Sequence, residues 1–111
     1  MNYCNSLTQY SRFKTREVKV GNLTFGGNNP IHIQSMTTCD TMDTEATVAE
    51  SIRMIEAGCK LVRITAPSKK EAHNLRNIKE ELFKRGYTTP IVADIHYTPN
   101  AAEVAATIVE K

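Results

Sequence analysis

The feature that most constrains the fold of this chain is an apolar, β-branched segment followed by an amphipathic one, a unit that occurs three times between residues 30 and 111. The apolar segments comprise residues 30–36, 60–65 and 90–96. They are hydrophobic almost throughout instead of alternating, which is typical of strands covered on both faces. The order β-α-β-α-β-α predicts an α/β fold with a parallel sheet and right-handed crossovers.

The first predicted helix has two competing start signals. Asp43 or Thr44 can cap a helix directly after the first strand, whereas Thr47-x-x-Glu50 offers a capping box slightly later. Apolar residues at positions 48, 52 and 55 give this helix one buried stripe. Gly58 supplies the left-handed residue that ends it.

The second and third helices are marked by similar signals. Ser68-x-x-Glu71 is a second capping box, and Gly86 ends the helix that it starts. Thr98-Pro99 is typical of the N-cap and first residue of a third helix, which is predicted to run to the end of the chain. Each predicted helix therefore follows directly on a strand.

A different pattern precedes the repeated unit. Residues 16–25 alternate around Gly21-Asn22, which predicts a β-hairpin. Residues 1–14 have no clear period, so we expect an N-terminal arm (1–14) followed by an α/β region (15–111). Three parallel strands do not close a barrel and leave open edges, so we expect the front part of a longer protein. The alternative is a small open α/β sheet that is complete in itself.

Composition excludes several classes of protein. Of the 111 residues, 41% are apolar and 23% charged, proportions of an ordinary globular protein and not of a disordered one. A net charge of +2 does not favour a nucleic-acid or membrane partner, and no apolar run has the length of a membrane helix. Without a secretory signal we expect a cytoplasmic protein. Cys4, Cys39 and Cys59 lack metal-ligand spacing, which predicts free thiols and no metal site in this chain.

The candidate functional residues lie where the predicted strands end, because ligands of parallel α/β folds bind at the carboxyl ends of the strands. This rule selects residues 34–38, 63–65 and 94–97. Arg63 interrupts an apolar strand, where an unpaired guanidinium is very costly to bury. Its planar fork suits a phosphate or carboxylate ligand, and an internal salt bridge to Asp94 explains it equally well.

Asp94 and His96 are two residues apart on one predicted strand, so their side chains share a face. They can meet one ligand together, through acid–base chemistry or hydrogen bonds to hydroxyl groups, or form a purely structural pair. Gln34 and the hydroxyl-rich residues 35–38 can bond phosphate or hydroxyl groups, although such residues more often satisfy loop backbone. The sequence has no glycine-rich nucleotide fingerprint and no nucleophile elbow.

From about residue 3 to residue 111, the chain resembles the 4-hydroxy-3-methylbut-2-enyl diphosphate synthases, iron–sulfur enzymes of the methylerythritol phosphate route to isoprenoids. The resemblance rests on four stretches in the right order and spacing: KTREVKVGN (14–22), IQSMT (33–37), AGCKLVRIT (57–65) and VADIHY (92–97). The opening YCNS (3–6) is similar to the longer, three-domain form of plants and some bacteria.

The resemblance implies a β-hairpin, closing the bottom of a TIM (β/α)8 barrel, and the first three βα units of that barrel. It implies reductive ring opening of 2-C-methyl-D-erythritol 2,4-cyclodiphosphate with loss of water, with ferredoxin or flavodoxin as electron donor and a homodimer as the full-length form. A 4Fe–4S cluster would be bound by a C-terminal domain outside this chain. Carried over by position, Arg63 would contact the diphosphate, and Asp94, His96 and Gln34 would line the substrate pocket, with no catalytic residue in this segment.

The chain also departs from the family pattern. The remaining family motifs and every cluster ligand lie beyond residue 111, and Tyr97 stands where the family usually has Phe, so the segment alone is expected to be inactive. Two other interpretations remain open from sequence. One is a pterin-binding barrel of the dihydropteroate synthase type, for whose acidic, Asn-rich site only Asp94 is present. The other is a small non-enzymatic α/β module that binds a partner through its open edge.

Overall fold

The computed structural model describes Cys4 and residues 6–111, and the chain divides into two compact units, residues 1–31 and 32–111. The first unit contains an antiparallel hairpin of β1 (Val18–Val20) and β2 (Leu23–Phe25). Gly21 turns the chain between them with a φ of +60°, so the predicted hairpin is confirmed. Of the expected N-terminal arm, residues 1–3 and 5 lie outside the described residues.

A close backbone approach follows the hairpin and requires glycine. Gly26 has a φ of +87°, and a Cβ atom there would lie 2.1 Å from the carbonyl oxygen of Arg16. The next residue, Gly27, donates its N–H to Thr15 Oγ1 at 3.0 Å. The Gly-Gly pair therefore joins the residues after the hairpin to those before it.

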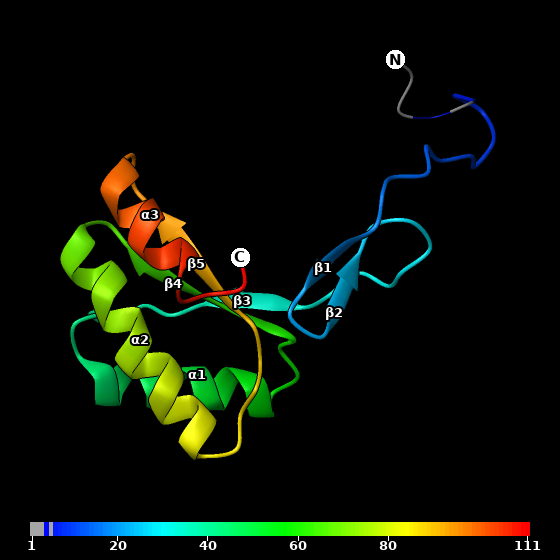
Figure 1. Ribbon diagram of the computed structural model, residues 1–111. Helices are drawn as coiled ribbons and strands as arrows, with labels where there is room; N and C mark the ends of the chain where they lie inside the picture. Colours follow the sequence, from blue (N-terminus) through cyan, green and yellow to red (C-terminus); the bar gives the residue numbers. More distant parts are fainter. Residues whose placement is uncertain (1–3, 5) are drawn as a thin grey trace. The chain divides into compact units, whose positions relative to one another are not determined.

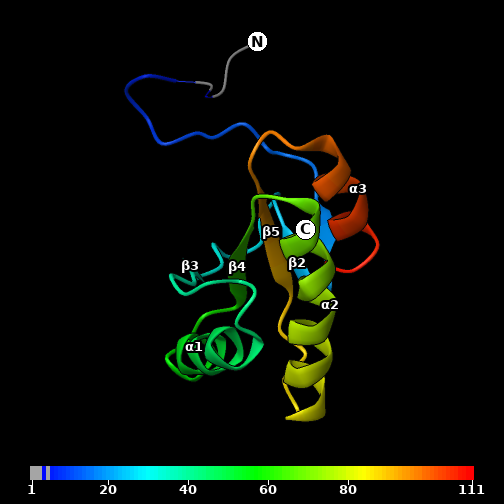
Figure 2. The same cartoon turned by 90° about the vertical axis from the view of Figure 1, so that its left-hand side faces the viewer.

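The second unit is a parallel sheet covered by helices (Figure 1). Its strands are β3 (Gln34–Met36), β4 (Leu61–Ala66) and β5 (Ile91–Ile95), in the order β3-β4-β5, and its helices are α1 (Thr44–Glu56), α2 (Lys69–Lys84) and α3 (Pro99–Ala106). The middle helix, α2, contacts both α1 and α3, and Figure 2 brings α2 and α3 to the near side. Within the described residues the strands do not close, so the sheet is that of a partial barrel.

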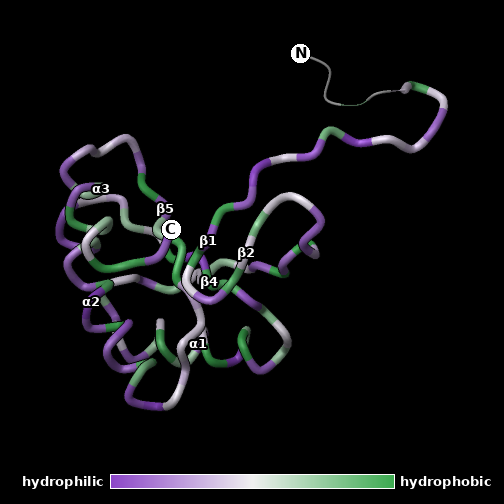
Figure 3. The backbone as a smooth tube through the Cα atoms, turned by 45° about the vertical axis from the view of Figure 1, so that its right-hand side comes forward, coloured by the Kyte–Doolittle hydropathy of each residue, from purple (hydrophilic) through white to green (hydrophobic). Residues whose placement is uncertain are grey.

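The hydrophobic core lies between one face of the sheet and the helices. Alternate residues of β4, Val62, Ile64 and Ala66, are buried in it. The helices contribute Val48 from α1, Ala72, Leu75, Ile78 and Leu82 from α2, and Ala101 and Ala105 from α3. Along α2, hydrophobic and hydrophilic colours alternate in Figure 3, as one buried and one exposed face require.

The second and third strands agree with the sequence to within a residue, but the first was predicted too long. It was expected over 30–36, whereas β3 begins at Gln34. The N–H groups of Lys60 and Leu61 both donate to the carbonyl of Ile33, at 2.8 and 3.3 Å. Because β4 begins only at Leu61, it does not extend beside the residues before Gln34, and a β-branched composition alone does not pair them.

The third helix was also predicted too long. It ends at Ala106 and does not run to the end of the chain. Instead the N–H of Lys111 donates to the Ile91 carbonyl at 3.2 Å, and the N–H of Ala93 donates to the Lys111 carbonyl at 2.8 Å. These are the bonds of a parallel strand pairing, so the backbone groups at the edge of β5 are satisfied by the last residue in place of further helical turns.

The structure shows which of the predicted capping residues begin the helices. Asp43 caps α1, because its Oδ1 accepts the N–H of Ala46 at 3.1 Å. Thr47 lies inside that helix, so the Thr47-x-x-Glu50 box is not a start. At α2 the Ser68 hydroxyl donates to the Glu71 carboxylate and makes no bond to the helix backbone, so only half of the expected capping arrangement forms.

We expect Ile78→Ala to lower the free energy of unfolding by about 2–5 kcal/mol, because the side chain is fully buried and its truncation loses buried apolar surface and leaves a cavity. Urea denaturation of the two proteins measures the difference. Phe83→Ala is the matched control on the same helix, since Phe83 is exposed, and should change stability by less than about 0.5 kcal/mol. Equal effects of the two substitutions would contradict the assignment of the core face.

Candidate functional site

Three of the predicted site residues meet on the sheet face opposite the helices. Asp94 and His96 lie at the carboxyl end of β5, as predicted, whereas Arg63 is the third of the six residues of β4 and lies within the strand, not at the end that the sequence suggested. Arg63 and Asp94 project from the sheet face opposite the helices, because Val62 and Ile64 on one strand and Ala93 on the other turn toward the core. Arg63 Nη2 lies 3.0 Å from Asp94 Oδ1. His96 Nε2 lies 3.2 Å from the other oxygen, Asp94 Oδ2. One carboxylate thus joins a guanidinium and an imidazole.

The electrostatics of this group keep Asp94 ionised. Its hydrogen bond to Arg63, and secondarily that to His96, hold the pKa of the Asp94 carboxyl below its ordinary value, although partial burial opposes the shift. The Asp94 side chain is 18% exposed, whereas that of Arg63 is 43% exposed and that of His96 48%. Asp94 therefore accepts hydrogen bonds at neutral pH, and the two nitrogen-bearing side chains present accessible surface beside it.

Gln34 is on the same face but not in the same group. In the register of β3 and β4, Gln34 lies opposite Leu61, whereas Met36 lies opposite Arg63. Gln34 is therefore one side-chain row nearer the amino ends of the strands than Arg63. The structure brings Arg63, Asp94 and His96 together and leaves Gln34 exposed beside them.

The loop between β3 and α1 borders the site, and Glu50 of α1 holds its first part. The Glu50 carboxylate accepts the N–H groups of Thr38 and Cys39, at 3.1 and 3.2 Å, and the Thr38 hydroxyl at 2.9 Å. Hydrogen bonds from Cys39 and Thr38 hold the pKa of Glu50 below its ordinary value. The Thr38 hydroxyl, a candidate ligand contact by sequence, thus donates to the protein itself.

A buried amide holds the second part of the same loop. Asn74 of α2 donates to the Thr41 carbonyl at 2.7 Å, and the Thr41 hydroxyl donates to the Thr65 carbonyl of β4, also at 2.7 Å. Sequence reasoning did not find Asn74, and it assigned Glu50 to a capping box instead of to this loop. The one available signal is an asparagine within the apolar face of a helix, beside Leu75 and Ile78, where a polar side chain needs a specific partner.

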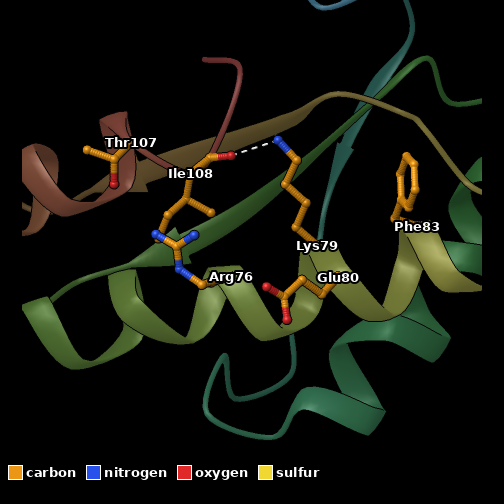
Figure 4. Close-up of a pocket in the computed structure, with 6 residues that line it drawn as sticks. All are labelled: Arg76, Lys79, Glu80, Phe83, Thr107 and Ile108. Atoms are coloured by element: carbon orange, nitrogen blue, oxygen red, sulfur yellow. Dashed lines mark hydrogen bonds between the residues drawn. The ribbon is translucent and has the colours of Figure 1, made fainter.

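A separate hollow of about 370 Å³ lies in the helix layer, between α2 and the residues after α3 (Figure 4). It is lined by Arg76, Lys79, Glu80, Phe83, Thr107 and Ile108. Lys79 Nζ donates to the Ile108 carbonyl and to Glu110 Oε1, both at 2.7 Å. Its ammonium group therefore already joins α2 to the segment after α3. The hollow holds none of the predicted site residues, and we place the candidate site at the strand ends on chemical grounds.

The described residues do not fit an iron–sulfur cluster. Cys4, Cys39 and Cys59 are free thiols, as predicted, and burial raises the pKa of the Cys39 thiol. No group of three or more His, Cys, Asp or Glu side chains among the described residues is arranged to hold a metal ion. In the same part of the chain, no helix combines the length and the apolarity needed to cross a membrane.

A parallel sheet of successive βα units that stays unclosed within the described residues defines a segment of an α/β barrel. The chain belongs to the GcpE TIM-barrel family, whose domain matches residues 15–111. This assignment bears out the resemblance seen in the sequence and the interpretation as the first units of a barrel, in place of a pterin-binding one.

Relatives from three bacteria give the family an activity by name. The chain is 55% identical over 102 residues to a protein of Parabacteroides distasonis, 54% over 109 residues to one of Akkermansia muciniphila and 53% over 102 residues to one of Leptospira interrogans. Each is named 4-hydroxy-3-methylbut-2-en-1-yl diphosphate synthase (flavodoxin). The matches cover 92%, 98% and 92% of this chain but only 17%, 19% and 15% of those relatives, so the chain spans a small part of their length.

We expect Arg63→Ala to raise the pKa of Asp94, because the bond to Arg63 is the largest cause of its lowering. A carboxyl whose folded pKa lies below its unfolded value of about 3.9 stabilises the fold above that pH, and the stabilisation is lost as the pH falls through the folded pKa. Carboxyl NMR titration measures the midpoint, with Arg76→Ala of α2 as control. If the titration midpoint of the Asp94 carboxyl is the same in Arg63→Ala as in the wild type, the ion pair is disproved.

Proposed function

We propose that this chain forms part of the diphosphate-binding barrel of a 4-hydroxy-3-methylbut-2-en-1-yl diphosphate synthase. The observation that carries the proposal is the convergence of Arg63, Asp94 and His96 on the open sheet face, toward the carboxyl end of β5. The names of the relatives support the choice of this activity among the many that α/β barrels perform.

Arg63 is the residue that binds the anionic end of the substrate in this proposal. Asp94 occupies one edge of its guanidinium, at 3.0 Å, and 43% of the side chain remains exposed. A guanidinium has five N–H donors in a plane, so it can hold Asp94 and still offer a fork to a phosphate. The ion pair fixes the direction of that fork before a ligand arrives, which reduces the entropy lost on binding.

Asp94 and His96 bind the rest of the ligand. The Asp94 carboxylate can accept hydrogen bonds from substrate hydroxyl groups, and it orients the imidazole of His96 through the Nε2 contact at 3.2 Å. Gln34, one row away on the same face, lines the pocket from the side of β3. We assign substrate binding to these four residues and no covalent or proton-transfer role.

The reaction of the full-length enzyme is proposed as the reductive ring opening of 2-C-methyl-D-erythritol 2,4-cyclodiphosphate, with loss of water, in the cytoplasm. Flavodoxin is the electron donor that the relatives' names favour over ferredoxin. In this proposal a 4Fe–4S cluster belongs to another part of the full-length enzyme, and the free cysteines of the described residues form no group that could hold it. The homodimer and the inactivity of the isolated segment stay predictions.

Calorimetric titration of the chain with the cyclodiphosphate tests the proposal. We expect binding, and an affinity about tenfold to a hundredfold lower for Arg63→Ala, because a hydrogen bond to a charged group contributes about 1.5–3 kcal/mol. Arg76→Ala removes a guanidinium of the helix layer and serves as the control. Undiminished affinity in Arg63→Ala would remove Arg63 from the site, and equal losses in both variants would indicate non-specific attraction of the anion.

A further inference from the structure

One residue beside the site has a backbone conformation that does not suit its side chain. Tyr97 has a φ of +57°, and it is the single non-glycine residue with a positive φ in the described part of the chain. The other positions with positive φ are all glycines: Gly21, Gly26, Gly27, Gly58 and Gly86. Elsewhere, then, this sequence meets the need for a left-handed residue with glycine, and next to His96 it uses a bulky aromatic one.

The local turn explains the backbone angle but not the tyrosine. Only three residues connect the end of β5 at Ile95 to the start of α3 at Pro99. The Thr98 hydroxyl fixes this connection by donating to the carbonyls of His96 and Pro67, both at 3.0 Å. This connection places Tyr97 in the left-handed region, where glycine or asparagine is favoured and tyrosine is strained.

Packing does not compensate for the strain either. The side chain of Tyr97 is fully exposed, so its ring buries no apolar surface against the residues that the structure describes. The exposed Phe83 differs, because it lies in the regular backbone of α2 and has no conformational cost to explain. Met36 is exposed on the open sheet face, but in an ordinary strand conformation. A strained and unburied aromatic side chain is expected where its contact is made with a ligand.

We propose that Tyr97 determines substrate specificity by contacting the carbon skeleton of the ligand whose phosphate groups Arg63 binds. The inference rests on the function proposed above. Arg63, Asp94 and His96 supply charged and polar contacts, which an inorganic diphosphate satisfies as well as an organic one. Tyr97 directly follows His96 at the end of β5 and adds the aromatic surface that distinguishes the two.

Two ligands tested on matched variants separate this role from anion binding. The cyclodiphosphate and inorganic pyrophosphate are titrated calorimetrically into the wild-type chain, Tyr97→Gly, Tyr97→Phe and the control Phe83→Ala. For Tyr97→Gly we expect an affinity for the cyclodiphosphate about tenfold lower and an unchanged affinity for pyrophosphate. Tyr97→Phe keeps the ring and should bind both ligands as the wild type does, as should Phe83→Ala.

Urea denaturation of Tyr97→Gly and Tyr97→Asn completes the test. Both residues tolerate a positive φ, so we expect both variants to be at least as stable as the wild type. Lower stability of both would show that the ring stabilises the fold and would overturn the inference. Equal loss of affinity of Tyr97→Gly for the two ligands would also overturn the inference. So would no loss of affinity for either ligand, a result that would indicate that Tyr97 contacts a polypeptide instead. If neither ligand binds the wild-type chain, the proposed function itself fails, a result distinct from these.

Discussion

The alternation of side chains along β4 is the constraint on which the rest of the second unit depends. Val62, Ile64 and Ala66 are buried against the helices, and burial of each gains free energy from the apolar area removed from water. Because successive residues of a strand point to opposite faces, this burial fixes Arg63 and Thr65 on the other face. A shift of one residue would place a guanidinium in the core, so the hydrophobic face determines where the charged face lies.

Parallel pairing with β4 fixes which face each residue of β5 presents. Hydrogen bonds from two helices fix the position of the β3–α1 loop. The register of Thr65 opposite Asp94 brings the carboxylate within reach of Arg63 across the strands. Asn74 and Glu50 then hold the β3–α1 loop from two different helices through buried or partly buried hydrogen bonds. The helix layer thereby both covers the core and positions one wall of the candidate site, so preorganisation of the site and stability of the fold share residues.

Much of this arrangement was predictable because it follows from local patterns. Strand and helix order, the caps at Asp43 and Gly58, and the common face of Asp94 and His96 all depend on residues close in sequence. The errors concern partners that are distant in sequence. The length of β3 is set by where β4 begins, and the end of α3 by the pairing of Lys111 with the edge of β5 at Ile91 and Ala93. The role of Asn74 needed the position of Thr41, which lies 33 residues earlier.

The two ends of the sheet differ in how completely their side chains are bonded within the chain. At the amino ends, Glu110 Oε2 accepts the N–H of Ile91 at 2.9 Å, while its other oxygen accepts the ammonium of Lys79 at 2.7 Å. Both oxygens of the Glu110 carboxylate are thus bonded to other parts of the chain, and they fasten the segment after α3 to β5 and α2. Toward the other end, Arg63 within β4 and Tyr97 after β5 remain exposed, the first partly paired and the second strained. The backbone strain at Tyr97 is where this chain departs from its own stability optimum, as the ligand contact proposed for this residue would require.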